Sequence, residues 1–365
     1  MEILIPLTVW NEIDLSLWIK SQNWIETEVT EECCQVIEDL KLFPKAIVKN
    51  QKMEGKTFKE ILISEILANT LIWKCEKKYI NHLLWYLDGP FKEIVKKLLS
   101  NDKRVNINQY GETFFWIACE KGDFEVVKLL LNDKRDDVNK ANEYGSTPFS
   151  IACKEGHFKI VELLLNNERV DINKPNKQNE TPFYTACWNG RIEIVKILLN
   201  DTRIDINKTD NDNGWTPFYA ACFGGRIEIV KLLLNSERVD INKANEMGET
   251  PFYIACSKGH IEIVKLLLND KRIDINQASK KDDGTPFYAA CFGEHIEIVQ
   301  LLLNDERVDI NKAHNGQTPF HIACQNGYIE IVVLFLGNPR SIIFFFFVYI
   351  CPTTNINKKL TKRLN

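Results

Sequence analysis

A threonine that returns at a nearly constant spacing constrains this chain more than any other sequence feature. It recurs in steps of 33 to 35 residues, and a cysteine follows each copy by six residues. The threonines are Thr113, Thr147, Thr181, Thr216, Thr250, Thr285 and Thr318. The cysteines are Cys119, Cys153, Cys187, Cys222, Cys256, Cys291 and Cys324. Such a period indicates a stack of repeats, in which each unit covers the apolar face of the next.

Each unit reads as two helices followed by a polar loop, as in GETPFYIACSKGHIEIVKLLLNDKRIDIN at residues 248–276. Thr250 is a suitable N-cap, and Pro251 suits the first helical position, where its missing N–H costs nothing. Gly259 allows a tight turn before a strongly apolar second helix. We expect Asn269 to end that helix in the left-handed conformation.

This motif resembles the ankyrin repeat, whose signature is Thr-Pro-Leu-His-x-Ala at a period of about 33 residues. Here Phe replaces the Leu, and only His321 keeps the His. Tyrosine replaces that His at Tyr184, Tyr219, Tyr253 and Tyr288. The resemblance covers residues 89–340, with seven full copies and a partial one at 91–108. It implies an all-α solenoid of helix-turn-helix units with short hairpin loops, whose first helices and loop tips form a concave, protein-binding face.

Three residues depart from the repeat pattern at turns. Asn179 and Asp283 stand where other copies carry a glycine shortly before the threonine, and both residue types tolerate positive φ. Glu294 replaces the glycine between the two helices. We expect Glu294 to strain its turn, because a glutamate rarely adopts the left-handed conformation.

Residues 1–88 lack the repeat and are expected to form a separate N-terminal helical domain. The spacing of Trp10 and Trp18, the Glu54-Gly55-Lys56 turn and a helix at 77–87 resemble a sterile alpha motif, a small helical interaction domain. That resemblance implies self-association or a second partner. The alternative is an irregular helical cap, which any solenoid needs at its end.

Residues 341–365 also leave the repeat pattern, with an apolar stretch followed by a basic end. The run IIFFFFVYIC at 342–351 has ten apolar residues, whereas a membrane-spanning helix needs about 20. We favour a cap on the last repeat. A disordered tail, a membrane segment and translated AT-rich non-coding sequence are the alternatives.

No residue pattern indicates catalysis, a metal site or a cofactor. Packed helices lie about 8–10 Å apart, beyond the roughly 7 Å that a disulfide spans, so we expect the repeated cysteines to be free and buried. Free thiols suit a reducing, cytoplasmic location. His157, His260 and His295 begin second helices and are expected to be structural. The net charge of −4, from 46 basic and 50 acidic residues, favours neither nucleic acid nor an anionic membrane as partner.

Candidate partner-binding residues lie where the copies differ. Two variable residues follow each cysteine, and the ankyrin resemblance places them on the concave face. The candidates are Trp188, Asn189, Trp215, Phe223, Lys258 and Phe292. Exposed aromatic residues mark interfaces, although these rings could instead pack on neighbouring tyrosines. The loop tips at 209–213 and 279–283 are expected to add a polar, mainly acidic rim.

These observations predict a non-enzymatic scaffold or adaptor that binds a protein partner of unknown identity. One alternative is the substrate-recruiting subunit of a modification complex such as a ubiquitin ligase, although no recruiting motif is recognisable. Another is a purely structural spacer, which would not depend on the aromatic residues.

Overall fold

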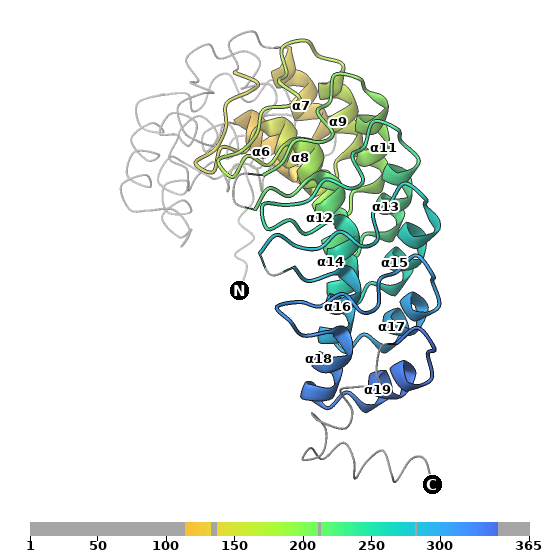
Figure 1. Cartoon of the computed structure of the whole chain (residues 1–365). Coiled ribbons are helices and arrows are strands. Elements are labelled where there is room, and N and C mark those ends of the chain that lie inside the picture. Colours follow the sequence, from red (N-terminus) through yellow and green to blue (C-terminus); the bar gives the residue numbers. More distant parts are fainter. Residues whose placement is uncertain (1–113, 133–136, 211–212, 282, 342–365) are drawn as a thin grey trace, which may run out of the picture. The chain divides into compact units, whose positions relative to one another are not determined.

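The computed structural model describes residues 114–132, 137–210, 213–281 and 283–341 (Figure 1). The named elements of the described part are all α-helices. There are fourteen of them, arranged as seven consecutive pairs joined by turns and loops. No strand is present in these ranges. Their β-type pairing is limited to an isolated antiparallel bridge between His314 and Gln317. The all-α repeat fold expected from the sequence is confirmed. The N-terminal domain, the partial repeat and the apolar tail lie outside the described residues.

Each pair has a first helix that begins at or just after the repeated threonine and a second helix that follows a tight turn. The first helices are α6 (Phe114–Lys121), α8 (Pro148–Glu155), α10 (Pro182–Trp188), α12 (Pro217–Phe223), α14 (Pro251–Ser257), α16 (Pro286–Phe292) and α18 (Pro319–Asn326). The second helices are α7 (Phe124–Leu131), α9 (Phe158–Leu165), α11 (Ile192–Asn200), α13 (Ile227–Leu234), α15 (Ile261–Asn269), α17 (Ile296–Leu303) and α19 (Ile329–Leu336).

The described helices fall into two compact units. One holds α6, α7 and most of α8 and α9, and the other holds α10 to α19. Within the second unit, neighbouring first helices pack on one another from α10 to α18, and so do neighbouring second helices from α11 to α19. Figure 1 shows the resulting two layers, with a loop before each threonine projecting from the layer of first helices; we call it the finger loop. All candidate binding residues belong to this second unit.

The first helices begin as the sequence predicts. In α12, the Thr216 hydroxyl accepts a hydrogen bond from the Tyr219 amide at 3.0 Å, and Pro217 occupies the first helical position. The same cap recurs at Thr181, Thr250 and Thr285. The cap fixes the direction in which the finger loop enters the helix.

The tight turns need residues with positive φ. Asn179 and Asp283 adopt φ of 62° and 54°, as expected, and Glu294 adopts 56° where other repeats use glycine. Asn269 ends α15 as expected, but the left-handed conformation expected there is wrong. Asn269 is the last helical residue, and Asp270 after it is extended, with φ of −91° and ψ of 114°.

The core lies between the layers and between repeats. The cysteines of the described helices are free and buried, and Leu233 is fully inaccessible. In the last repeat, Leu336 is 41% exposed, whereas the equivalent Leu268 and Leu303 are 8% and 4% exposed because a described repeat follows them. The tail is predicted to cover this face.

A polar ladder joins successive repeats in the loops after the second helices. Asn242 donates to the Arg272 carbonyl at 2.7 Å and accepts from the Asp274 amide at 2.9 Å. The equivalent pairs form at Asn139, Asn173, Asn207 and Asn276. Arg272 also donates to the Leu234 carbonyl, at the end of the preceding second helix. The ladder keeps neighbouring repeats in register, which positions the first helices of the candidate site.

Candidate partner-binding face

The candidate site begins with three residues on one side of the fourth repeat. Trp215 precedes the N-cap of α12, Tyr219 lies one turn into the helix, and Phe223 ends it. Tyr219 and Phe223 are four residues apart and lie on the same face of α12, and the Trp215 ring packs beside both. The centroid of Trp215 is 5.1 Å from that of Tyr219 and 4.7 Å from that of Phe223.

Trp188, at the end of α10, joins these rings from the preceding repeat. Its ring centroid lies 5.6 Å from Phe223, in a stacked arrangement, and 5.9 Å from Trp215. We call Trp188, Trp215, Tyr219 and Phe223 the aromatic cluster. Tyr219 is buried, whereas the other three rings are partly exposed. The cluster therefore contributes to the packing of two repeats and still presents aromatic surface.

The finger loop of the fourth repeat holds Trp215 in place through Asp210. The Asp210 carboxylate accepts hydrogen bonds from the amides of Trp215 at 2.9 Å and Asn213 at 3.2 Å. Its second oxygen lies 3.5 Å from the Tyr184 hydroxyl, and the residue is only 8% exposed. Asp210 therefore faces inward and does not contribute to the acidic rim expected at this tip, where Asp212 lies outside the described residues. The tip at 279–283 exposes Lys280 and Lys281.

Two tyrosines of the first helices, Tyr184 and Tyr219, are hydrogen-bond donors that stay protonated. Burial and the neighbouring Asp210 raise the pKa of Tyr184. Burial and Glu249 likewise raise the pKa of Tyr219, whose hydroxyl donates to Glu249 at 3.1 Å. These hydroxyls tie each first helix to the next finger loop, and their raised pKa values make them poor proton-transfer groups near neutral pH.

The remaining candidates are distributed unevenly around the cluster. The Lys258 ammonium lies 4.6 Å from the Phe223 ring centroid, a cation–π contact. Asn189 caps α10 and donates its side-chain amide to the Thr185 carbonyl at 2.7 Å. Phe292 belongs to a separate patch: its ring stacks on Tyr288 at 6.5 Å and is 58% exposed. The structure thus brings four of the six candidates together, while Asn189 stabilises the helix end and Phe292 lies apart.

Residues that begin the second helices were not predicted to touch this face, yet they bond to it. Arg226 donates Nε–H to the Trp188 carbonyl at 3.0 Å. His260 Nε2 lies 2.9 Å from the Phe223 carbonyl oxygen, a bond in which the protonated ring nitrogen donates. His295 is bonded in the same way to the Ser257 carbonyl at 2.9 Å. The structural role expected for His260 and His295 thus has a specific basis, namely satisfying carbonyls at the ends of first helices.

Comparison with known proteins decides the family. A family model described as ankyrin repeats (3 copies) matches residues 59–142, 80–176, 134–210, 204–279 and 273–342. The chain belongs to the ankyrin repeat family. No curated protein matches the chain. The match begins at residue 59, inside the segment for which the sequence also suggests a sterile alpha motif, and that second resemblance stays a prediction.

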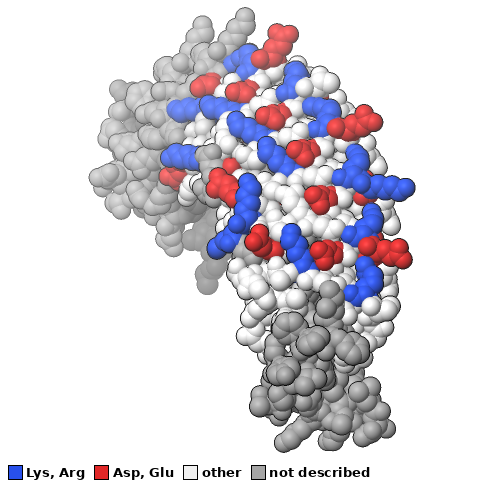
Figure 2. Space-filling view, viewed as in Figure 1, with Lys and Arg blue, Asp and Glu red and all other residues white. Residues whose placement is uncertain are grey.

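Ankyrin repeats are generally protein–protein interaction modules, so the aromatic cluster lies on a scaffold that commonly binds protein. Figure 2 shows Lys and Arg interspersed with Asp and Glu over the visible face of the described repeats. On the second helices the charges pair within one turn, as in Glu228–Lys231 at 2.7 Å. No helix of the described ankyrin stack is long and apolar enough to cross a membrane.

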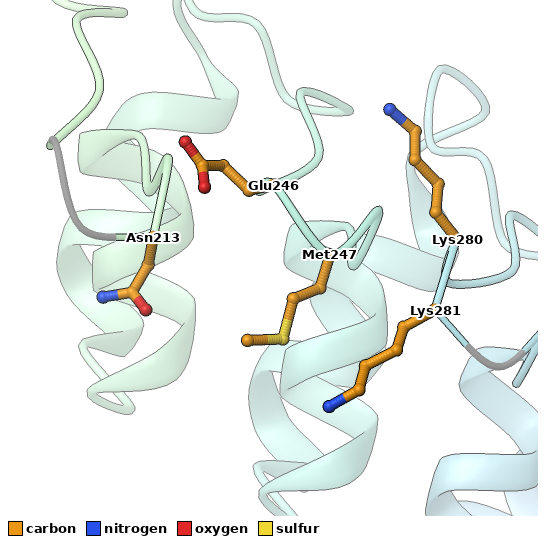
Figure 3. Close-up of a pocket in the computed structure, with 5 residues that line it drawn as sticks. All are labelled: Asn213, Glu246, Met247, Lys280 and Lys281. Atoms are coloured by element: carbon orange, nitrogen blue, oxygen red, sulfur yellow. The ribbon is translucent and has the colours of Figure 1, made fainter.

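A shallow cleft of about 360 Å³ lies between the finger tips of the fourth, fifth and sixth ankyrin repeats. Asn213, Glu246, Met247, Lys280 and Lys281 line it (Figure 3). The Met247 and Lys281 side chains extend toward the same side, while Glu246 and Lys280 point away from them. Met247 is 44% exposed, which makes the cleft a mixed apolar and charged surface. Among the described residues, no cluster of His, Cys, Asp and Glu has the arrangement of a metal site.

Proposed function

We propose that this ankyrin protein is a non-enzymatic, cytoplasmic scaffold that holds a protein partner on the face bearing the aromatic cluster and Phe292. One observation carries the proposal. The slot occupied by Trp188, Phe223 and Phe292 holds Lys154, Ser257 and Gln325 in other repeats, which fold into the same helix pairs. Because repeats with a polar residue in this slot form the same helix pair, the repeat fold does not require an aromatic ring there.

Exposure supports a role in binding for these rings. Phe292 keeps more than half of its surface accessible, although large apolar side chains gain free energy by leaving water. Burying such rings in a partner is the usual source of interface affinity, and Trp is enriched among the residues that dominate it. Trp188, Trp215 and Phe223 already pack on one another, so they present a preformed surface that loses little conformational freedom on binding.

The absence of an activated nucleophile in the described stack supports a non-enzymatic role. Burial raises the pKa of the Cys187 and Cys222 thiols well above the ordinary value, which suppresses the reactive thiolate. The proposed partner is a protein rather than a nucleic acid, since charges of both signs are interspersed on the visible face. A substrate-recruiting role in a ubiquitin ligase stays an alternative form of the same binding function.

The test is affinity capture with the full chain as bait, followed by mass spectrometry. Two variants carry the residue that the fifth repeat has in this slot, namely Phe223→Ser and Phe292→Ser. A matched control, Phe158→Ser, removes a 36% exposed aromatic residue from α9. We expect proteins that are captured by the wild type and the control and lost from both slot variants. Equal capture by all four baits would show that the slot is not the binding site and would favour the spacer interpretation.

A further inference from the structure

Backbone hydrogen bonds join the tips of the finger loops of the fourth, fifth and sixth repeats. The Glu246 amide donates to the Asn213 carbonyl at 3.0 Å, and the Lys280 amide donates to the Met247 carbonyl at 2.7 Å. These four residues also line the cleft in Figure 3, where the three tips follow one another. The three loops are therefore connected directly at their tips, in addition to the packing of the helices that follow them.

A glycine follows each carbonyl that accepts one of these bonds, and a side chain at that glycine would obstruct the bond. A Cβ atom added at Gly248 would lie 2.5 Å from the Lys280 amide nitrogen. A Cβ atom added at Gly214 would lie 3.1 Å from the Glu246 amide nitrogen and 2.9 Å from the Glu246 Cγ atom. Non-bonded heavy atoms pack best at about 3.5–4.0 Å, so the next finger loop would have to move away in either case.

Positive φ alone does not explain glycine at these two positions. Asn179 and Asp283 occupy the same place in their finger loops, two residues before the threonine, with φ of 62° and 54°. Gly316 occupies it in the seventh repeat with φ of 78°, and a Cβ atom added there would meet nothing within 4 Å. Gly214 and Gly248 thus differ from Gly316 in the closeness of the next finger loop.

The finger loop of the fifth repeat is also bonded to the aromatic cluster at its base. Asn245, which is 5% exposed, donates its side-chain amide to the Tyr219 hydroxyl at 3.2 Å and to the Glu249 carboxylate at 2.8 Å. Tyr219 donates to the same carboxylate at 3.1 Å. Separating buried hydrogen-bonded groups is costly, because each would lose its partner away from water. This loop is therefore held against a ring of the cluster.

The finger loop of the fourth repeat connects the joined tips to the cluster. Trp215, a ring of the cluster, follows Gly214 directly, and Asn213 accepts the hydrogen bond from the fifth loop. The Asp210 carboxylate accepts hydrogen bonds from both the Trp215 and the Asn213 amides. A displacement of Asn213 would therefore reach Trp215 through one short, internally bonded loop.

We propose that Gly214 and Gly248 are positioning residues for the partner-binding face. Gly214 allows the fifth finger loop to bond to the loop that carries Trp215, and Gly248 allows the sixth loop to bond to the fifth. The joined loops fix Trp215 against Trp188 and Phe223, so the aromatic cluster is ordered before a partner arrives and loses less conformational freedom on binding. This inference rests on the proposed function, because it concerns what sets the affinity of the same face.

The first measurement is hydrogen exchange, resolved to single amides, in full-length Gly214→Ala and Gly248→Ala, with Gly316→Ala as the matched control. All three variants place a Cβ atom at a φ between 71° and 81° and share that backbone strain, whereas only the first two meet the next loop. The Lys280 amide should exchange about twofold to tenfold faster in Gly248→Ala, the range of one net hydrogen bond. The Glu246 amide should respond in the same way to Gly214→Ala. Gly316→Ala should leave both amides unchanged.

The second measurement is the affinity of the same variants for the partner captured with the full chain. It is made at a temperature at which circular dichroism shows every variant folded, so that a loss of stability alone does not change the affinity. Gly214→Ala and Gly248→Ala should bind about twofold to tenfold more weakly than Gly316→Ala, the cost of ordering one side chain on binding. Gly214→Ala makes the milder contact and serves as the test if Gly248→Ala does not fold.

The outcomes separate this inference from the proposed function. Unchanged exchange of both amides would overturn the inference, and so would faster exchange combined with the affinity of Gly316→Ala. In either case, binding that still requires Phe223 would leave the proposed function intact. An equal loss of affinity in all three glycine variants would assign the effect to backbone strain and would also overturn the inference. Binding that is unaffected by Phe223→Ser would overturn the proposed function, and the inference with it.

Discussion

Replacing Asn242 with alanine should loosen the junction between the fourth and fifth repeats. The side chain makes two hydrogen bonds across that junction, at 2.7 Å to the Arg272 carbonyl and at 2.9 Å from the Asp274 amide. Each hydrogen bond contributes about 0.5–1.5 kcal/mol net, so removing both should lower the free energy of unfolding by about 1–3 kcal/mol. Both hydrogen bonds are exposed, so water can replace them in the variant. The free energy of unfolding should therefore fall by about 1 kcal/mol, the lower end of this range. For 365 residues with an unfolding entropy of about 2.1 cal/mol/K each, that corresponds to a thermal shift of about 1 °C.

The assay is urea unfolding of the full chain followed by circular dichroism. Because repeat stability depends on nearest-neighbour interfaces, Asn242→Ala should also broaden the transition by uncoupling the two sides of the junction. Asn242→Asp should lower the free energy of unfolding at least as much, because a carboxylate oxygen would then face the Arg272 carbonyl oxygen. The matched control is Asn269→Ala, which truncates an exposed asparagine at the end of α15. Equal stability of Asn242→Ala and this control would refute the ladder's role.

Three further predictions concern other parts of the stack. Cys222, fully buried and with a raised pKa, should react slowly with a thiol reagent in the native protein and rapidly after unfolding; rapid native labelling would contradict its placement. Burial lowers the pKa of His321, whose Nδ1 accepts the Thr318 amide, so stability should fall as pH drops below about 6.5. Thermal melts of the wild type and His321→Tyr at several pH values should show that the variant lacks this loss of stability at low pH. The same pH dependence in both proteins would argue against the role given to His321. Glu294→Gly should raise the thermal midpoint, because it relieves a positive φ that costs about 1 kcal/mol; a lower midpoint would contradict the assigned strain.

Local signals in the sequence were sufficient for the architecture. The threonine and proline fix the start of each first helix, and the period fixes the stacking, so the helix pairs and buried cysteines were predictable. The positive φ values at Asn179, Asp283 and Glu294 were also predictable, because these residues replace glycines of known role. Each of these predictions depends on contacts within one repeat or on the repetition itself.

Contacts between repeats were harder to foresee. Asp210 was assigned to an acidic rim, but in the structure its carboxylate accepts amides of its own loop and meets Tyr184 of the preceding repeat. A composition of polar residues does not reveal which carboxylate turns inward. The sequence likewise showed the loops as polar without indicating that Asn242 bridges two repeats. The position of Lys258 over Phe223 also depends on how two units stack.

The most direct test of the binding face compares two neighbouring helices of the fourth repeat. Phe223→Ala removes a partly exposed ring from the end of α12, and Leu233→Ala removes a fully buried side chain from α13. Both variants are measured for thermal midpoint and for affinity toward the captured partner. Phe223→Ala should weaken binding by about 2 kcal/mol, a factor of roughly 30, with a small stability loss of about 0.5–1.5 kcal/mol from its ring contacts. Leu233→Ala should destabilise the stack by about 2–5 kcal/mol. A midpoint for Phe223→Ala as low as that of Leu233→Ala, with unchanged affinity, would contradict the assignment of this ring to partner binding.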